Sequence, residues 1–187
     1  MRRPLAIVSI LSAFAFFPAP EAIAEPLRQS VTFYGGPATH QFVSQIFQGN
    51  FDVNGVILGL AYDRWLSDLG AGFSLEAEVQ AALFFANPTS FAVAGGFGVR
   101  YDTSHWIGRP SSLAFYTGPS YADEPARNEG HNERFLEYVA VEFALENINK
   151  SQWDGVIRMF HRSGAFGLYG HDADTGSMLG IGIRRRF

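Results

Sequence analysis

The chain ends in the stretch Leu179-Gly180-Ile181-Gly182-Ile183-Arg184-Arg185-Arg186-Phe187. Apolar residues alternate there with small or basic ones, and the last residue is aromatic. Such period-two alternation predicts a strand with one apolar face and one small or polar face. A strand of about ten residues that closes on an aromatic residue is typical of the final strand of an outer-membrane β-barrel.

The same alternation recurs along the rest of the chain. Between residues 71 and 83 the odd positions are apolar or small, and Ser, Glu and Gln fill even positions from 74 to 80. Residues 91–101 and 138–146 alternate in the same way. We therefore predict an all-β fold, namely an eight-stranded antiparallel transmembrane β-barrel of the outer membrane. Its strands are expected near residues 28–35, 55–65, 71–84, 90–101, 112–121, 135–146, 153–165 and 177–187.

Charge decides which face of this barrel meets lipid. Eight charged residues of the predicted strands fall opposite the apolar faces: Glu76, Glu78, Glu142, Glu146, Arg100, Arg158, Arg184 and Arg186. An eight-stranded barrel has an interior filled by side chains, so these charges are predicted to pair inside it. The alternative is a soluble barrel with an apolar, ligand-holding interior, but it would leave the terminal Phe187 unexplained.

The connections follow from the strand count. An even number of strands places both termini on the periplasmic side. Residues 66–70 (Leu66–Gly70) and 147–152 then form short periplasmic turns, and the longer links 36–54, 122–134 and 166–176 lie outside. The link 102–111 is longer than a periplasmic turn should be. Near the predicted periplasmic ends are three tryptophans that suit an aromatic belt, Trp65, Trp106 and Trp153.

The beginning of the chain predicts export. Arg2 and Arg3 precede an apolar run of 13 residues, 5–17, and the small-residue site Ala22-Ile23-Ala24 follows. This is the order of a secretory signal peptide, so residues 1–24 are predicted to be removed and residues 25–187 to form a single domain. The run is shorter than the roughly 20 residues that a spanning helix needs, which disfavours the alternative of an uncleaved anchor.

Composition and charge argue against nucleic acid as a partner. Without Arg2, Arg3 and Glu21, the 14 basic and 18 acidic residues become 12 and 17, a formal net charge of −5. Nucleic acid is therefore not an expected partner, because its phosphates require a basic surface. The chain has no cysteine, and 15% of its residues are aromatic. An exported chain without disulfides depends on its fold alone, and barrel closure leaves no strand edge unpaired.

Two residues with the chemistry of ester hydrolysis share one face of the predicted strand 153–165. Arg158 marks the opposite face as the interior, so His161 and Ser163 are predicted to point toward lipid. They lie eight and ten residues beyond Trp153, and since about 9–11 residues cross the hydrocarbon, both should lie near its outer boundary.

The ester linkages of a lipopolysaccharide anchor lie at the same depth. Positions i and i+2 of a strand are roughly 7 Å apart, close enough for the imidazole to take the serine proton. The alternative is that both are interfacial polar residues without a catalytic role.

A family resemblance supports the catalytic interpretation of His161 and Ser163. The segment Asn149-Lys150-Ser151-Gln152, then Gly155-Val156-Ile157-Arg158-Met159-Phe160-His161-Arg162-Ser163, a Gly-rich loop and a closing strand resemble the outer-membrane lipid A 3-O-deacylases, acyloxyacyl hydrolase-like barrels. In that family a strand carries His-x-Ser-Asn, and a Glu at the start of the last strand completes a lipid-facing triad. The resemblance implies that Ser163 is the nucleophile and His161 the base, that lipid A of the outer leaflet is the partner, and that no cofactor is required.

Two positions depart from the family pattern. Gly164 stands where the family has the Asn that follows the serine. Counting back from Phe187 places Ser177 at the position of the family Glu, and counting from His161 without gaps places Thr175 there. Neither holds an imidazole as a carboxylate does, and losing the orienting acid of a triad can cost about 10⁴ in turnover.

Two acids remain near the pair, Asp172 and Asp174 in the outer loop, and either could replace the missing carboxylate. The loop His171-Asp172-Ala173-Asp174 falls short of the oxygen shell of a calcium site, so no metal site is predicted. The sequence leaves two hypotheses open. The first is an active lipid A deacylase-like ester hydrolase, and the second is a catalytically inactive outer-membrane barrel with an envelope-structural or surface-interaction role. The sequence indicates no oligomeric state.

Overall fold

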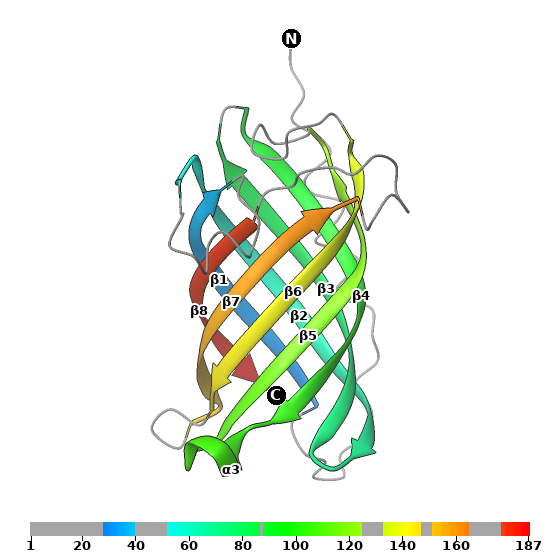
Figure 1. The fold of residues 1–187 in the computed structure, drawn as a ribbon, viewed down its shortest axis with the longest axis vertical. Coiled ribbons are helices and arrows are strands. Elements are labelled where there is room, and N and C mark those ends of the chain that lie inside the picture. The colour runs from blue at the N-terminus through cyan, green and yellow to red at the C-terminus, as the bar shows by residue number, and fades with distance from the viewer. Residues whose placement is uncertain (1–27, 40–51, 87, 125–132, 147–150, 165–176) are drawn as a thin grey trace.

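A computed structural model describes residues 28–39, 52–86, 88–124, 133–146, 151–164 and 177–187. They form a closed barrel in which each strand pairs antiparallel with the next and β1 pairs with β8 (Figure 1). The strands are β1 (Gln29–Thr39), β2 (Gly55–Gly70), β3 (Phe73–Phe85), β4 (Ser90–Asp102), β5 (Ser111–Ala122), β6 (Phe135–Leu145), β7 (Trp153–Ser163) and β8 (Ser177–Arg186). The predicted eight-stranded antiparallel barrel is confirmed, with strand ends within a few residues of those expected.

Two connections, β2–β3 and β4–β5, need comment against the prediction. Residues 66–70, predicted to be a turn, extend strand β2, and the chain reverses at Gly70-Ala71-Gly72, where all three residues have positive φ. The two glycines adopt this conformation without strain, which is why the reversal occurs there. The long link after β4 contains the short helix α3 (Ser104–Ile107), which accounts for its length. None of the helices in the described residues is long and apolar enough to cross a membrane.

The outside of the barrel is an apolar belt. Large apolar side chains that alternate with buried ones point outward from most of the strands, and those at least 40% exposed include Leu58, Leu60, Val79, Phe97, Phe115, Ile157, Ile181 and Ile183. A transmembrane barrel presents such a belt to lipid. The alternative with an apolar ligand-holding interior is contradicted, because charged side chains occupy the inside.

The interior is held together by a buried network of ion pairs, and Glu142 of β6 is its centre. Its carboxylate lies 3.2 Å from Arg100, 3.0 Å from Arg158 and 3.2 Å from Arg184. Arg158 also bonds Glu78 at 2.6 Å, and all three of Glu78, Glu142 and Arg158 are fully enclosed. The predicted pairing of acids on β3 and β6 with arginines on β4, β7 and β8 is therefore confirmed.

The network continues toward the end of the barrel that carries α3, here called the α3 end. Arg184 lies 2.8 Å from Asp154 and 3.1 Å from Glu146, and Arg186 lies 3.0 Å from Asp154. Since a buried charge is costly unless it is paired, this arrangement is what permits a charged interior in so narrow a barrel.

Small residues make room for the remaining interior side chains. A Cβ atom on Gly59 would meet the ring of Tyr34, and one on Gly98 would meet the ring of Tyr116. The tyrosines lie flat over these glycines, and their hydroxyl groups donate to Gln80 at 2.6 Å and to Glu76 at 2.5 Å. Gly59 of β2 and Gly98 of β4 therefore serve packing inside the barrel.

Candidate functional site

A histidine and a serine on neighbouring strands are joined on the outer face of the barrel, at the end opposite α3. His161 of β7 and Ser177 of β8 are direct register partners. The Nδ1 atom of His161 lies 2.9 Å from the Oγ atom of Ser177. The serine is buried, with 2% of its surface exposed, whereas His161 is half-buried. The imidazole is thus held against the wall of the barrel and does not project freely into its surroundings.

Ser163 follows His161 on the same face of β7. It is half-buried, as His161 is, and the intervening Arg162 is fully buried on the inner face. Since strand residues two apart lie roughly 7 Å from each other, the two outward side chains are neighbours. Both predicted site residues therefore lie where the alternation placed them.

Arg162 fixes the segment that presents them. Its Nε atom donates to the hydroxyl oxygen of Ser120 at 3.0 Å, and its Nη2 atom donates to the carbonyl oxygen of Arg134 at 2.9 Å. These bonds run along the inner wall, to β5, two strands away, and to the residue that precedes the neighbouring strand β6. A clamp on the inner face holds the backbone of β7, so the outer side chains at 161 and 163 are presented on a rigid strand.

A carboxylate that the sequence analysis missed lies beside the serine. Glu137 of β6 is the direct register partner of Ser163. The carboxylate oxygen Oε1 of Glu137 accepts a hydrogen bond of 2.6 Å from Thr117 of β5. Directly opposite residues have Cβ atoms about 4.5–5.5 Å apart, which places negative charge next to the Ser163 hydroxyl group.

The signal for Glu137 was present in the sequence. It has the same parity as Val139, Val141 and Phe143, so alternation puts a lone acid on an otherwise apolar outward face. Ser177 was already placed at the position of the family Glu by counting back from Phe187, and the pairing of β7 with β8 brings it to His161. The candidate replacement acids Asp172 and Asp174, together with Thr175, lie outside the described residues, as do residues 1–24.

Gly164 is described and buried, and no amide side chain is present at this position to polarise a carbonyl group. Among the described residues, no group of three or more His, Asp or Glu side chains is arranged to hold a metal ion. The candidate loop His171–Asp174 falls outside the described ranges.

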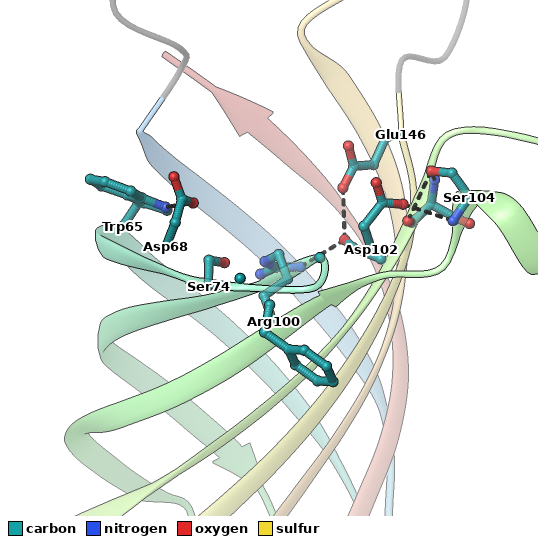
Figure 2. A pocket seen from close by; sticks show the side chains of 12 residues that line it. Trp65, Asp68, Ser74, Arg100, Asp102, Ser104 and Glu146 are labelled. Carbon is teal, nitrogen blue, oxygen red and sulfur yellow. Dashed lines mark hydrogen bonds between the residues drawn. The ribbon is translucent and has the colours of Figure 1, made fainter.

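Two adjoining cavities of about 370 and 210 Å³ open at the α3 end, away from His161 and Ser163. Both are lined by Trp65, Ser74, Arg100 and Glu146, and Figure 2 shows the larger one. Trp65 donates from Nε1 to Asp68 at 3.2 Å, and the guanidinium group of Arg28 lies 3.8 Å from the centre of its ring. The cavities end on the interior ion pairs, and Ser112, which lines the larger one, donates a hydrogen bond of 2.7 Å to Glu146, itself an ion-pair partner of Arg184.

The position of Trp65 corrects one expectation. The sequence placed it in an outward aromatic belt with Trp106 and Trp153, and these two are indeed 67% and 44% exposed. Trp65 instead has the parity of the buried Asp63 and turns toward the mouth of the barrel. A strand alternates strictly, and proximity to its end does not decide which face a residue occupies.

Comparisons with known proteins support the fold. No family model matches the sequence, and no curated protein matches it significantly. The crystal structure of the outer membrane enzyme PagL superimposes with a TM-score of 0.59 at 10% identity, over 84% of this chain and 99% of that one. The backbone structure of the Yersinia pestis outer membrane protein Ail in a phospholipid bilayer nanodisc covers 86% of this chain and 99% of its own, also at 10% identity, with a TM-score of 0.49. At such identity the likeness to PagL establishes a common fold.

Proposed function

We propose that this protein is an outer-membrane ester hydrolase of the lipid A 3-O-deacylase type, in which Ser163 is the nucleophile and His161 the general base. The observation that carries the proposal is the hydrogen bond of 2.9 Å between His161 Nδ1 and Ser177 Oγ on the outward face, beside Ser163. An oriented imidazole next to a serine is the basic requirement for serine-based acyl transfer.

The proposed mechanism assigns a role to each ring nitrogen of His161. With Nδ1–H donating to the Ser177 hydroxyl oxygen, Nε2 is the unprotonated nitrogen that takes the proton of Ser163. The Ser163 oxygen attacks the carbonyl carbon of an acyl ester, and the sugar oxygen leaves with the proton that His161 returns. Water then attacks the acyl-enzyme, His161 accepts one of its protons, and the fatty acid and the free Ser163 hydroxyl group are released.

The position of the pair selects a lipid substrate. His161 and Ser163 lie on the face that carries the apolar belt, near the end of β7 that is remote from α3. In an outer membrane with the α3 end in the periplasm, this level corresponds to the outer leaflet, where acyl chains meet the sugars of lipid A. A water-soluble ester has no reason to approach a lipid-facing nucleophile, whereas the 3-O-acyl ester of lipid A is delivered there by the membrane itself.

Ser177 distinguishes this site from a triad with a carboxylate. A hydroxyl group fixes the tautomer and the orientation of the imidazole, but it contributes no negative charge to stabilise the imidazolium ion. We therefore infer a slower enzyme than one with an acid at this position.

The same observation favours a second candidate function. A neutral Ser177 and the absence of Asn after Ser163 are also expected of a barrel that has lost catalysis and keeps an envelope-structural or surface-interaction role. This candidate predicts that lipid A is unchanged by the protein, and it requires no contribution from His161.

Mass spectrometry of lipid A separates the two candidates. Cells that express the wild type, Ser163→Ala or Ser67→Ala would be compared, since Ser67 lies in β2 near the α3 end and provides a matched serine control. We expect loss of one hydroxyacyl chain with the wild type and with Ser67→Ala, and intact lipid A with Ser163→Ala.

Folding must be verified in the same membranes, by the difference in gel mobility between heated and unheated samples. Intact lipid A in cells that contain the folded wild-type barrel would contradict the hydrolase and support the non-catalytic candidate. Deacylation that persists in Ser163→Ala would show that another residue is the nucleophile.

A further inference from the structure

Two arginines break the rule by which charge stays inside this barrel. Arg64 of β2 and Arg185 of β8 point outward and are exposed, whereas Arg158 and Arg184 are buried in ion pairs. Neither outward guanidinium group forms an ion pair with an acidic side chain of the described residues. Outward charge on a membrane barrel is unfavourable at mid-depth and tolerated near the interfaces, so these residues mark a boundary.

The register brings the two arginines onto one small area of the wall. Arg185 is the partner of Val31 on β1, and Val31 is the partner of Tyr62 on β2. Arg64 lies two residues beyond Tyr62. Two strand spacings and two residue steps amount to roughly 12 Å between the Cα atoms of the arginines. This separation allows two extended arginine side chains to approach a single phosphate group from both sides.

The residues around them fit a lipid headgroup. Between the arginines, Tyr62 donates a hydrogen bond of 2.8 Å to the side chain of Gln29. Trp153, 44% exposed, lies opposite Arg185 with the guanidinium carbon 5.7 Å from its ring centre. Tyrosine and tryptophan are the residues that prefer the headgroup level of a membrane. Arg64, Arg185, Gln29, Tyr62 and Trp153 are here called the Arg64–Arg185 patch.

The apolar belt begins directly above the patch on the same strands. Ile183 precedes Arg185 on its face and is 51% exposed, and Leu60 precedes Tyr62 on its face and is 50% exposed. The patch therefore lies where hydrocarbon gives way to headgroups, at the α3 end. Opposite charge identifies its ligand, because guanidinium groups bind phosphate in a bidentate manner and no described acidic side chain pairs with them.

We propose that the Arg64–Arg185 patch binds the phosphate group of an anionic glycerophospholipid in the periplasmic leaflet. The inference uses the membrane orientation contained in the proposed function and is independent of whether Ser163 hydrolyses an ester. It assigns lipid contacts of opposite kinds to the two ends of the barrel: a substrate at the His161 end, and a bound phospholipid that anchors the wall at the α3 end.

Native mass spectrometry tests the proposal directly. Folded protein in neutral detergent would receive an equimolar mixture of phosphatidylglycerol and phosphatidylcholine, and the lipids retained per protein would be counted. We expect one phosphatidylglycerol to be retained, with a preference of roughly fivefold for each arginine that contacts it. The preference should fall when the salt concentration is raised, because the attraction is electrostatic and partly exposed.

Variants locate the site. Arg64→Gln/Arg185→Gln should lose the preference, and Arg109→Gln should keep it, because Arg109 is an exposed arginine of the α3–β5 connection on another side of the barrel. Arg64→Lys/Arg185→Lys should retain part of it, since charge remains and the bidentate geometry is lost.

Equal retention of the two lipids by the wild type, or a preference unchanged in the double glutamine variant, would overturn the proposal. Lipid A mass spectra of the same variants separate this result from the proposed function, because loss of the phospholipid site should leave deacylation in place.

Discussion

The interior and the outer rim of this barrel both contain polar side chains, but the hydrogen-bond and ion-pair partners of these side chains differ between the two regions. Inside, Arg158 is held by Glu78 and Glu142 at 2.6 and 3.0 Å, so its charge is paired within the enclosed interior. On the rim, His161 bonds a neutral hydroxyl group and faces outward among apolar residues. The inner ion pairs offset the cost of burying charge in a narrow interior, whereas the outer pair lies on the face that carries the apolar belt. Polar groups turned toward lipid in this way are the basis of the proposal that this pair is a functional site.

Replacement of His161 by glutamine should have the largest effect, and it tests the outer polar pair. Without a base, Ser163 keeps its proton, so we expect deacylation of lipid A to fall by about 10⁴ or more while the barrel still folds. The measurement is single-turnover release of fatty acid by purified protein in mixed micelles. His105→Gln, an exposed change on α3, is the matched control and should leave the rate unchanged. Activity retained by the His161 variant would contradict its assignment as the base.

Replacement of Arg158 by leucine should produce the next largest effect, and it should act on stability. Glu78 and Glu142 would each lose a partner in the enclosed interior, and breaking a buried pair costs about 3–5 kcal/mol. Urea unfolding in lipid vesicles, followed by tryptophan fluorescence, measures this loss. Arg109→Leu removes an exposed arginine and should change the free energy of unfolding by less than about 0.5 kcal/mol. If the two variants lowered the free energy of unfolding equally, the proposed difference between buried and exposed arginines would be wrong.

Replacement of Ser177 by glutamate is expected to increase activity. Ser177→Glu places a carboxylate next to Nδ1 of His161, where it stabilises the imidazolium ion that forms during attack, and we expect kcat to rise about tenfold or more. Ser177→Ala should lower kcat by about tenfold with little change in KM, because the tautomer is no longer fixed. A glutamate variant that folds and is slower than the wild type would show that Ser177 does not occupy the position of the orienting acid.

Glu137 should produce the smallest effect. Its carboxylate is next to Ser163 but bonded to Thr117, and it lies diagonally across the strands from His161. Through-space stabilisation of the imidazolium ion at that separation predicts a two- to fivefold loss of kcat in Glu137→Gln. The loss should shrink as salt is added, whereas a purely structural role would give a salt-independent change. Glu124→Gln, at an exposed site beyond β5, is the control.

Most of the fold follows from the sequence because a strand in a barrel wall alternates strictly. The parity of Glu76, Glu142 and Arg158 identified the inner face, and the opposite parity on β7 placed His161 and Ser163 on the outer face. Turns were harder, since residues 66–70 are compatible with either a turn or an extended strand. Only the positive φ values at Gly70-Ala71-Gly72 locate the reversal.

The site was predictable only as far as a single strand extends. His161 and Ser163 are neighbours in sequence, so periodicity relates them. Their partners come from other strands, and the pairing register that brings Ser177 and Glu137 to them depends on the whole barrel. A one-residue change of register would move either partner to the other face, and the sequence of one strand does not specify the register.

The ion pair between Glu78 and Arg158 joins residues 80 positions apart. Glu78 meets this arginine only when β7 arrives, after most of the chain has entered the wall. A partly assembled barrel would expose an unpaired carboxylate to a medium that cannot solvate it. Assembly in the membrane should therefore be all-or-none, with the late strands acting as the checkpoint, and a chain that stops after β6 should fail to insert stably.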